Sequence, residues 1–356
     1  MTSRISLKQI ANQLGISPRA VSQALRSDGK GTTRVAADTI ERVRAAAREG
    51  GYRMNTSARA LRTNRFRQAG FLIRYDFRDT RPPVVEAPAL FGMGERLNAC
   101  GWHLIVVQGN SDVTGNGAPV FVREHSLDGV VIASTNPEED ERHMNEMNEA
   151  GVPYVWFNSD RPVNAVGILD EVGAELATQH LIELQHKRIV FVASHGLHYS
   201  AAARERGYTR VMKSYGLEPI IWDCSLNTQG ESGYDQRMAI RSYFLRMVIE
   251  ELLPRHKPTA IVCVTDTEAI LVCRALHTAG IDIPGDISVV GYNDLPSVDI
   301  AYPPLTTVHA DFYTLGSMAA EMLLELLDSD KTELKSRFLH PRLVVRNSTS
   351  PAPRVK

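Results

Sequence analysis

Several features are scarce or missing in this 356-residue chain. It has four cysteines, with no CxxC pair and no histidine at zinc-finger spacing, so the sequence predicts neither a metal site nor a disulfide framework. No apolar run approaches the roughly 18 residues of a membrane span, and the N-terminus has no apolar signal-peptide segment. We therefore expect a cytoplasmic protein with no cofactor and no membrane partner.

The motifs of common enzyme classes are also missing. The chain has no GxSxG, P-loop, HExxH or GxGxxG sequence beside the helix or strand that such a motif requires. Asp266 could combine with His195 or His198, but the sequence indicates no nucleophile to act with such a pair. An enzyme is therefore the least supported class of function.

What the chain does have is a strongly basic beginning. Residues 1–67 contain 14 Lys and Arg against 4 Asp and Glu, although the formal charge of the whole chain is −1. Lys and Arg that neutralise phosphates supply the sequence-independent part of DNA binding. A basic small domain on an acidic larger one favours a nucleic-acid partner, and a solvated basic tail is the alternative.

The basic segment predicts two short helices. Apolar residues recur at helical spacing over residues 7–14, and Gly15 ends this first helix. Ser17 followed by Pro18 forms the start of a second helix, because serine caps a helix and proline suits its first position. The second helix leaves an outer face suited to a groove of DNA, made of Arg19, Ala20, Ser22, Gln23 and Arg26.

After residue 67, short apolar runs alternate with helical stretches. This pattern indicates parallel sheets covered on both faces, and the length suffices for about two domains beyond the small one. The expected strands are 69–73, 103–108, 129–133, 153–157, 188–193, 219–222, 260–264 and 287–292. The expected helices include 89–100, 173–184, 202–214, 236–253 and 267–280.

Polar residues follow many of these strands, at the edge where ligands bind in such sheets. Amides and carboxylates suit the hydroxyl groups of a sugar, and the rings of Trp156, Phe157, Tyr234 and Phe312 would suit its C–H surface. Ordinary strand-end loops are the alternative. Arg74 and Arg161 leave open a negatively charged ligand, such as a sugar acid or phosphate, with surface salt bridges as the alternative.

Two blocks of sequence carry a family resemblance. The first is Leu7-Lys-Gln-Ile-Ala-Asn-Gln-Leu-Gly-Ile-Ser17, and the second runs from Asp286-Ile-Ser-Val-Val-Gly-Tyr-Asn-Asp294 to Pro303-Pro-Leu-Thr-Thr-Val308. They resemble the lactose-repressor/galactose-repressor (LacI/GalR) family of bacterial transcription regulators, and the similarity covers nearly the whole chain.

The resemblance implies an α/β fold with a further N-terminal part. We expect a three-helix helix-turn-helix headpiece at 1–54, then a hinge helix and linker at 55–67. The effector-binding and dimerisation core at 68–356 would consist of two doubly wound parallel-sheet subdomains, like periplasmic sugar-binding proteins. The N-subdomain would span 68–168 and 312–339, and the C-subdomain 169–311 and 340–356.

The resemblance also implies site residues. Early residues of the second helix would read the major groove, and Leu61 would insert into the minor groove as a wedge. The expected DNA-binding residues are Leu7, Lys8, Ser17, Pro18, Arg19, Ala20, Ser22, Gln23, Arg26, Tyr52, Asn55, Ala58, Arg59 and Leu61. The expected effector-binding residues are Arg74, Asn158, Arg204, Tyr234, Thr265, Asp266, Asn293, Asp294 and Phe312. For Arg204, the alternative is a structural ion pair with a nearby carboxylate.

Some positions depart from the family pattern. Met54 stands where proline is usual before the hinge, and Ala20 and Gln23 replace residues that are commonly Thr and Arg. Thr265 stands where Asn is common and Asn293 where Asp is common. The operator sequence and the identity of the sugar therefore stay open.

The implied function is a ligand-responsive repressor of carbohydrate-utilisation genes. Its partners would be double-stranded, pseudo-palindromic operator DNA, a sugar or sugar derivative, and a second copy of the chain in a homodimer or tetramer. A solute-binding receptor without a DNA role is the alternative, and it would explain the core alone.

Overall fold

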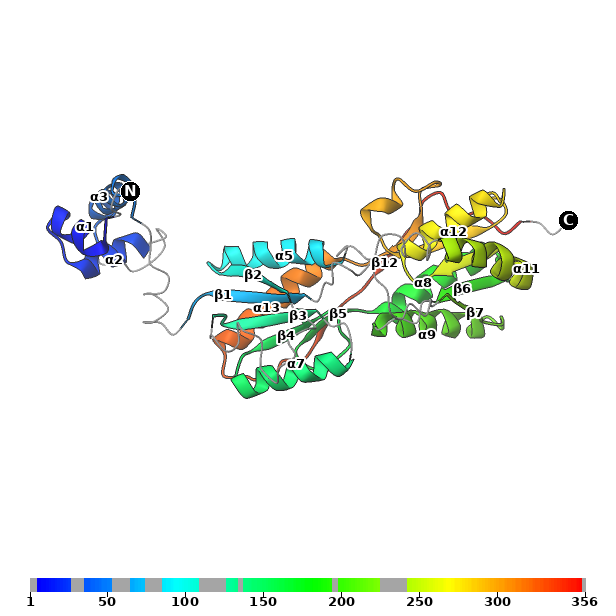
Figure 1. The fold of residues 1–356 in the computed structure, drawn as a ribbon, viewed down its shortest axis with the longest axis horizontal. Helices are drawn as coiled ribbons and strands as arrows, with labels where there is room; N and C mark the ends of the chain where they lie inside the picture. Colours follow the sequence, from blue (N-terminus) through cyan, green and yellow to red (C-terminus); the bar gives the residue numbers. More distant parts are fainter. Residues whose placement is uncertain are drawn as a thin grey trace. The chain divides into compact units, whose positions relative to one another are not determined.

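The chain divides into two compact units, an N-terminal unit (residues 1–66) and a core unit (residues 67–356) (Figure 1). The computed structural model describes residues 5–26, 35–52, 65–73, 85–108, 126–133, 137–193, 198–224 and 242–353.

The N-terminal unit contains three helices, α1 (Leu7–Leu14), α2 (Pro18–Arg26) and α3 (Ala37–Glu49). Each helix contributes one apolar stripe to a small shared core, as the spacing of apolar residues predicts for α1 and α2. The buried members of this core are Ile10, Ala11, Val21, Ala24, Val43, Ala46 and Ala47.

The turn between α1 and α2 is fixed by local hydrogen bonds. Gly15 has φ 65°, a left-handed conformation that glycine adopts without steric cost, and it caps the end of α1. The Ser17 hydroxyl accepts a hydrogen bond from the Ala20 amide at 3.1 Å, which confirms the predicted cap of α2. At the start of α1, Ser6 and Gln9 cap each other's backbone amides.

The core unit contains two six-stranded sheets. The first sheet has the strand order β11-β5-β4-β3-β1-β2, and every neighbouring pair in it is parallel. Its strands are β1 (Gln68–Ile73), β2 (His103–Gln108), β3 (Gly129–Ala133), β4 (Tyr154–Phe157), β5 (Ala165–Ile168) and β11 (Arg337–Leu339).

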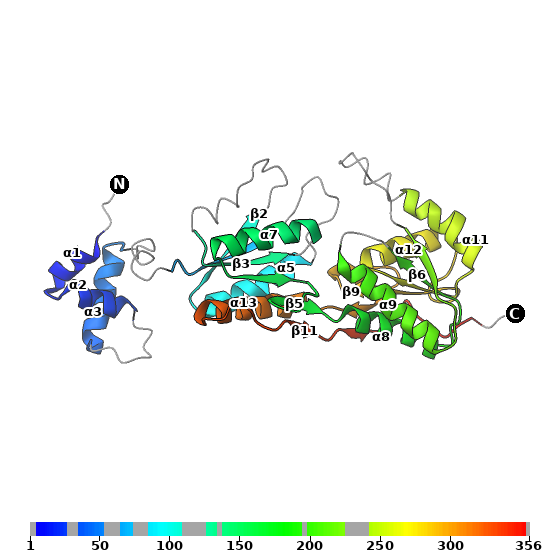
Figure 2. The same ribbon diagram turned by 90° about the horizontal axis from the view of Figure 1, so that it is seen from below.

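Helices cover both faces of the first sheet. α5 (Glu86–Ala99) and α13 (Phe312–Asp328) lie side by side on one face, where Met93 and Leu323 join the same apolar cluster as Val131. α7 (Pro137–Ala150) covers the opposite face through Met147, and Figure 2 shows α7 and α13 on either side of the strands. Both faces of the sheet bury side chains because successive residues of a strand point to opposite faces.

The second sheet has the order β12-β10-β9-β8-β6-β7, in which only the β10–β12 pair is antiparallel among the described pairings. Its strands are β6 (Ile189–Ala193), β7 (Ile220–Asp223), β8 (Ala260–Cys263), β9 (Ser288–Asn293), β10 (Thr306–His309) and β12 (Arg342–Val344).

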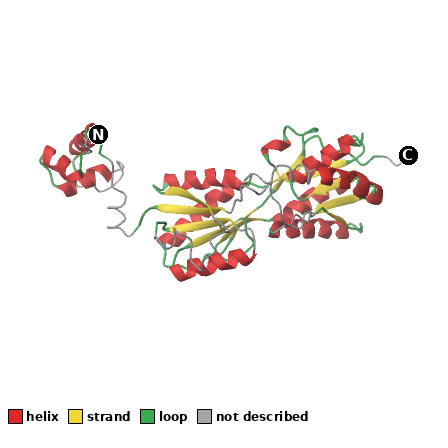
Figure 3. Ribbon diagram, viewed as in Figure 1, coloured by secondary structure: helices red, strands yellow, loops and turns green. Residues whose placement is uncertain are grey.

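The second sheet is also covered on both faces (Figure 3). α8 (Asp170–Glu183) and α9 (Tyr199–Ser214) pack on one face. α12 (Asp266–Thr278) packs on the other face, together with the π-helical turn η1 (Val248–Leu252) and α11 (Leu253–His256). A 3-10 turn, η2 (Pro296–Val298), follows β9. Parallel sheets covered on both faces are the arrangement that the sequence predicts.

The chain passes between the two sheets three times. It leaves the first sheet after β5 and starts α8 within two residues, returns from β10 to α13 through Ala310 and Asp311, and leaves again between β11 and β12. α8, α9 and α12 therefore begin at the strand ends that face these connections. The residues at these helix starts and strand ends form the region that we call the sheet junction.

Candidate nucleic-acid interface and ligand site

The outer face of α2 is the candidate nucleic-acid interface. Pro18, Arg19 and Gln23 are exposed, while Ala20 and Ser22 are half-buried beside the core residues of the helix. Arg and Gln side chains can pair with the edges of guanine and adenine in the major groove. The sequence thus places two groups able to read bases on one exposed helix face.

Other predicted DNA contacts take different positions. Lys8 and Ser17 are exposed, the first on α1 and the second at the cap of α2. Leu7 and Tyr52 are half-buried and pack against the core of the N-terminal unit, so part of each side chain stabilises the fold.

Several predicted residues lie outside the described part of the chain. They are Asn55, Ala58, Arg59 and Leu61 of the expected hinge, Arg74 and Tyr234 of the expected effector site, and the side chain of Arg26.

At the sheet junction, Arg204 is the centre of a buried polar cluster. Only 5% of the residue is exposed, and its Nε donates to Asp170 Oδ1 at 2.8 Å. Nη1 donates to the Val264 carbonyl at 2.7 Å, and Nη2 donates to Asn293 Oδ1 at 3.3 Å. The structural ion pair that the sequence left open is therefore present, with Asp170 as the carboxylate.

The Tyr292 ring forms the floor beneath Arg204. The guanidinium carbon lies 3.7 Å from the ring centroid, a distance suited to a cation–π contact. The phenol can occupy this position because residue 173 is glycine: a Cβ there would lie 2.1 Å from the Tyr292 Oη. The sequence Gly291-Tyr-Asn293 thus contributes both the floor and the amide partner of Arg204.

Asp266 lies deeper in the junction and has no exposed surface. Its Oδ1 accepts from the Thr307 hydroxyl at 2.5 Å, and its Oδ2 accepts from the Leu295 amide at 2.8 Å. Burial raises the pKa of this carboxyl to about 7. Its close fit against Gly291, where a Cβ would lie 2.3 Å from Oδ1, identifies it as a packed group of the fold.

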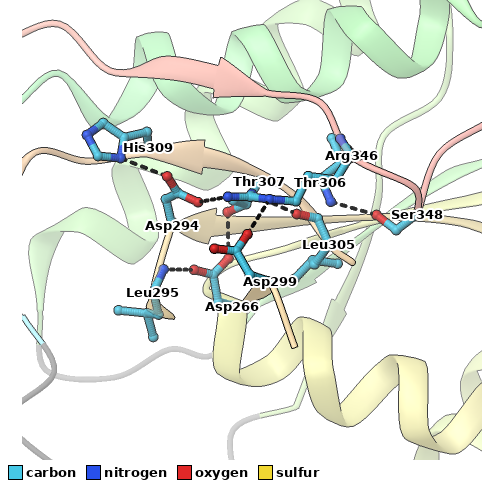
Figure 4. Close-up of polar contacts among 10 residues, drawn as sticks. All are labelled: Asp266, Asp294, Leu295, Asp299, Leu305, Thr306, Thr307, His309, Arg346 and Ser348. Atoms are coloured by element: carbon cyan, nitrogen blue, oxygen red, sulfur yellow. Dashed lines mark hydrogen bonds and ion pairs between the residues drawn. The ribbon is translucent and has the colours of Figure 1, made fainter. Parts of the chain in front are cut away.

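Asp294 contacts the end of β10 and the segment that follows β12 (Figure 4). One carboxylate oxygen lies 2.9 Å from Nδ1 of His309, at the end of β10, and the other accepts from Arg346 at 2.8 Å. Arg346 follows β12 and also pairs with Asp299. Asn293 and Asp294 both have positive φ, at 111° and 60°, which concentrates backbone strain at this position.

Asn158, directly after β4 of the first sheet, contacts His198, which caps α9 of the second sheet. Its carbonyl accepts from His198 Nε2 at 3.0 Å, and His198 Nδ1 accepts from the Ser200 amide at the start of α9. This contact bridges the two sheets across the junction.

The remaining predicted residues have structural partners. Thr265 caps α12 by accepting from the Thr267 amide at 3.1 Å. Phe312 begins α13 and is 5% exposed within the core cluster. Trp156 and Phe157 are each 1% exposed, so the expectation that their rings face a ligand is wrong, because both pack inside the first subdomain. Arg161 lies over the Trp156 ring at 4.6 Å.

Sequence reasoning missed two residues of the junction, Asp170 and Tyr199. They are the first residues of α8 and α9, and their side chains lie next to the Arg204 cluster. A signal for Asp170 was available, because it follows the short apolar run from Ala165 to Leu169, which is a strand by the same reasoning applied elsewhere.

The described residues lack two further kinds of feature. No group of three or more His, Cys, Asp or Glu side chains there could hold a metal ion. None of the helices in those ranges is long and apolar enough to cross a membrane.

Comparison with known proteins gives three kinds of match. Residues 178–349 match the family described as periplasmic binding protein-like domain. The HTH-type transcriptional repressor PurR of Actinobacillus pleuropneumoniae is 29% identical over 352 residues, covering 96% of this chain and 98% of the relative.

Two solved structures have the same fold over the whole chain. The lac repressor dimer bound to operator and the anti-inducer ONPF has a TM-score of 0.74 at 24% identity, covering 98% of this chain and all of that one. The complex of the transcriptional regulator CelR with cellobiose has a TM-score of 0.66 at 25% identity, covering 97% and 100%.

These matches include the N-terminal unit, because the core unit alone is about four fifths of the chain. The alternative of a solute receptor without a DNA role is therefore wrong. The relatives are transcriptional regulators and not enzymes. The basic helix-turn-helix unit, the two covered parallel sheets and the full-length matches together support a transcriptional regulator similar to those of the LacI/GalR family.

Proposed function

We propose that this protein represses carbohydrate-utilisation genes in the bacterial cytoplasm and that a sugar or sugar derivative changes its affinity for operator DNA. The observation that carries the proposal is the pairing of an exposed base-reading face on α2 with a second unit whose polar residues gather between two sheets. DNA binding and ligand binding then occur on separate parts of one chain, which is the arrangement that allosteric control requires.

We assign the parts as follows. Residues 1–54 bind the major groove, residues 55–67 form a hinge with Leu61 as a minor-groove wedge, and residues 68–356 bind the effector and the second copy. The relatives named above support this division, since one is a dimer bound to operator and another is bound to cellobiose. Within the core, Asp294 would transmit closure, because it links the end of β9 to His309, where the chain leaves β10 for the first sheet, and to Arg346 after β12.

A homodimer follows from the operator symmetry that we expect. One copy of α2 offers few base contacts, so two copies on a pseudo-palindrome are needed for specific binding. The core unit exposes large apolar side chains that would suit an interface, among them Phe91 at 73%, Ile300 at 86% and Tyr302 at 82%. Sedimentation of the full-length chain decides between a monomer, which would contradict this assignment, a dimer and a tetramer.

The experiment that tests the proposed function is a selection followed by a gel shift. Random duplexes bound by the full-length protein are enriched and sequenced, and the enriched duplex is then titrated with and without ribose, glucose, galactose and cellobiose. We expect a pseudo-palindrome whose affinity changes when one of these sugars is present. Enrichment of no sequence, or of a sequence whose affinity no sugar changes, would contradict the proposal.

A further inference from the structure

Residues 347–352 have no regular secondary structure and lie against β9 and β10; we call them the C-terminal strap. The first part of the strap is fixed by Ser348, which has no exposed surface. The Ser348 hydroxyl donates to the Val289 carbonyl at 2.6 Å, and the Ser348 carbonyl accepts from the Val289 amide at 2.8 Å. The same hydroxyl accepts from the Thr306 amide at 2.8 Å. This part of the strap is therefore paired with two strands of the second sheet.

The second part of the strap, residues 349–352, is held by bonds to separate segments. The Ser350 amide donates to the Ser288 hydroxyl at 3.1 Å. The Ala352 amide donates at 2.8 Å to the carbonyl of Leu184, which caps the end of α8. Bonds that are not part of a continuous ladder open individually, so this end can leave the sheet while Ser348 stays in place.

His186 holds the strap from the turn that follows α8, and only 1% of the residue is exposed. Its Nε2 lies 2.9 Å from the Ser350 carbonyl, and its Nδ1 lies 3.0 Å from the hydroxyl of Thr259, just before β8. A carbonyl oxygen only accepts, so Nε2 donates, and the neutral ring leaves Nδ1 to accept from the hydroxyl. The neutral form of His186 therefore satisfies both neighbours.

A second histidine contacts the same part of the strap. His180 on α8 has its Nε2 3.0 Å from the Thr349 hydroxyl. Burial lowers the pKa of both histidines from the ordinary value of 6.5, and a positive charge on His180 lowers that of His186 further. The hydrogen bond to the Ser350 carbonyl favours the charged form of His186, but burial outweighs it. Both rings are thus neutral near pH 7 while the strap is bound.

A proton on His186 would enter a site without a compensating charge. Both ring nitrogens contact neutral groups, and residues 347–352 have no charged side chain. Glu183 raises the pKa of His180, but the charge that acts on His186 is the positive one of His180. The charged or titratable side chains on the elements around the ring are His180, Glu183, Lys187, Arg188, Lys257 and Asp286. The cost of charging His186 in place is therefore not offset by a carboxylate.

We propose that His186 and His180 form a proton-sensitive clasp: while both rings are neutral they hold residues 349–352 against the second sheet, and acidification releases this end of the strap. After release, each ring is hydrated and takes up a solvent proton at its ordinary pKa of 6.5, whereas the bound ring does so only at lower pH. Falling pH therefore favours release below about 6.5, and the effect is absent well above this value. The inference goes beyond the proposed function, because His186 follows the end of α8 and the sheet junction lies at its start.

The test is hydrogen exchange of the full-length protein at pH 7.5 and pH 5.5, followed by mass spectrometry. Exchange times are scaled to the intrinsic exchange rate at each pH. The amides of Ser350 and Ala352 report the clasped end, and the Val289 amide reports the part that Ser348 holds. The amides of β6 report unfolding of the whole second sheet.

The main variant is His186→Gln, because glutamine can still donate to the Ser350 carbonyl and cannot take up a proton. The matched control is His340→Gln, whose ring is exposed between β11 and β12. His180→Gln is a second variant. It removes the positive charge that lowers the pKa of His186 and leaves His186 itself in place.

The wild type should lose protection of the Ser350 and Ala352 amides by roughly 3- to 30-fold at pH 5.5, because this pH lies below the ordinary pKa of the released rings. The amides of Val289 and of β6 should stay protected. Most of the loss should disappear in His186→Gln, and a smaller part of it in His180→Gln. His340→Gln should lose as much protection as the wild type.

Equal protection of the two strap amides at both pH values in the wild type would overturn the inference, and so would an undiminished loss in His186→Gln. A loss that extends to β6 would show unfolding of the sheet in place of release, and it would also contradict the clasp. If His186→Gln does not fold, His180→Gln decides: a smaller loss than in the wild type supports the clasp, and an undiminished loss contradicts it.

Discussion

Arg19 on α2 and Arg204 on α9 carry the same guanidinium in opposite surroundings. Arg19 is exposed on the N-terminal unit, whereas Arg204 is 5% exposed and donates to a carboxylate, a carbonyl and an amide. An exposed cation contributes little to folding and keeps its donors for a partner, while a buried cation must be paired by its own protein. The N-terminal unit thus leaves the donors of Arg19 available to a partner, whereas the sheet junction uses those of Arg204 to stabilise the fold.

The largest expected effect is that of Arg204→Ala on stability. The substitution leaves the Asp170 carboxylate buried without its cation, so the free energy of unfolding should fall by about 3–5 kcal/mol. Urea denaturation of the full-length chain measures this change. Arg206→Ala is the control two residues away: its side chain is 58% exposed and pairs with Glu171, so its loss should lie below about 1 kcal/mol. Equal losses of unfolding free energy in the two variants would contradict the predicted difference between a buried and an exposed arginine.

A second effect comes from Asp266 and extends over a range of pH. The folded carboxyl has its pKa raised to about 7, against 3.8 ordinarily, so between these values the folded chain holds a proton that the unfolded chain has released. Rising pH therefore favours unfolding until about pH 7, and the dependence levels off above it. Relative to Asp266→Asn, the free energy of unfolding of the wild type should fall from pH 4 to pH 7. A constant difference between the two proteins over that range would show that Asp266 does not titrate in this way.

The third prediction concerns the exposed side of the comparison. Arg19→Ala should weaken binding to the selected operator by about 1–3 kcal/mol and relax the preference at one base pair, without lowering the free energy of unfolding. Lys8→Ala should instead weaken binding to operator and random DNA alike, because a phosphate contact carries no sequence information. Fluorescence anisotropy on both duplexes measures these losses. The same loss on both duplexes for Arg19→Ala would remove Arg19 from base recognition.

The smallest expected effect is Ser17→Ala. The loss of the hydroxyl that caps α2 should destabilise the N-terminal unit by about 1 kcal/mol, and the core unit should be unaffected because the bond is local. Hydrogen exchange of the backbone amides reports each unit separately. Faster exchange should be confined to the N-terminal unit, and slowed or unchanged exchange of the α2 amides would argue against the cap.

The parts of the fold set by local pattern could be predicted from the sequence. The strands His103–Gln108 and Gly129–Ala133 occur with the expected bounds, and α1 ends at the expected glycine. α8 and α9 each begin three residues before the predicted start, at Asp170 and Tyr199, whose side chains lie at the junction and do not belong to the apolar stripe.

The partners within the junction could not be predicted in the same way. β10, β11 and β12 are only three or four residues long, too short to show a period, and they are strands because neighbouring strands pair with them. The family resemblance supplied Arg204, but its carboxylate lies 34 residues earlier, beyond the unpredicted β5. The chain connections determine which polar groups come into contact, and the spacing of residues along a short segment cannot predict these contacts.

Because the chain passes between the sheets three times, the first sheet can be completed only late in synthesis. The three helices of the N-terminal unit lie within the first 49 residues, whereas the first sheet needs β11, which ends at Leu339. At roughly 5–20 residues per second, the intervening translation takes on the order of 15–60 s. For that interval the nascent chain contains all three helices of the N-terminal unit, while the first sheet still lacks its last strand.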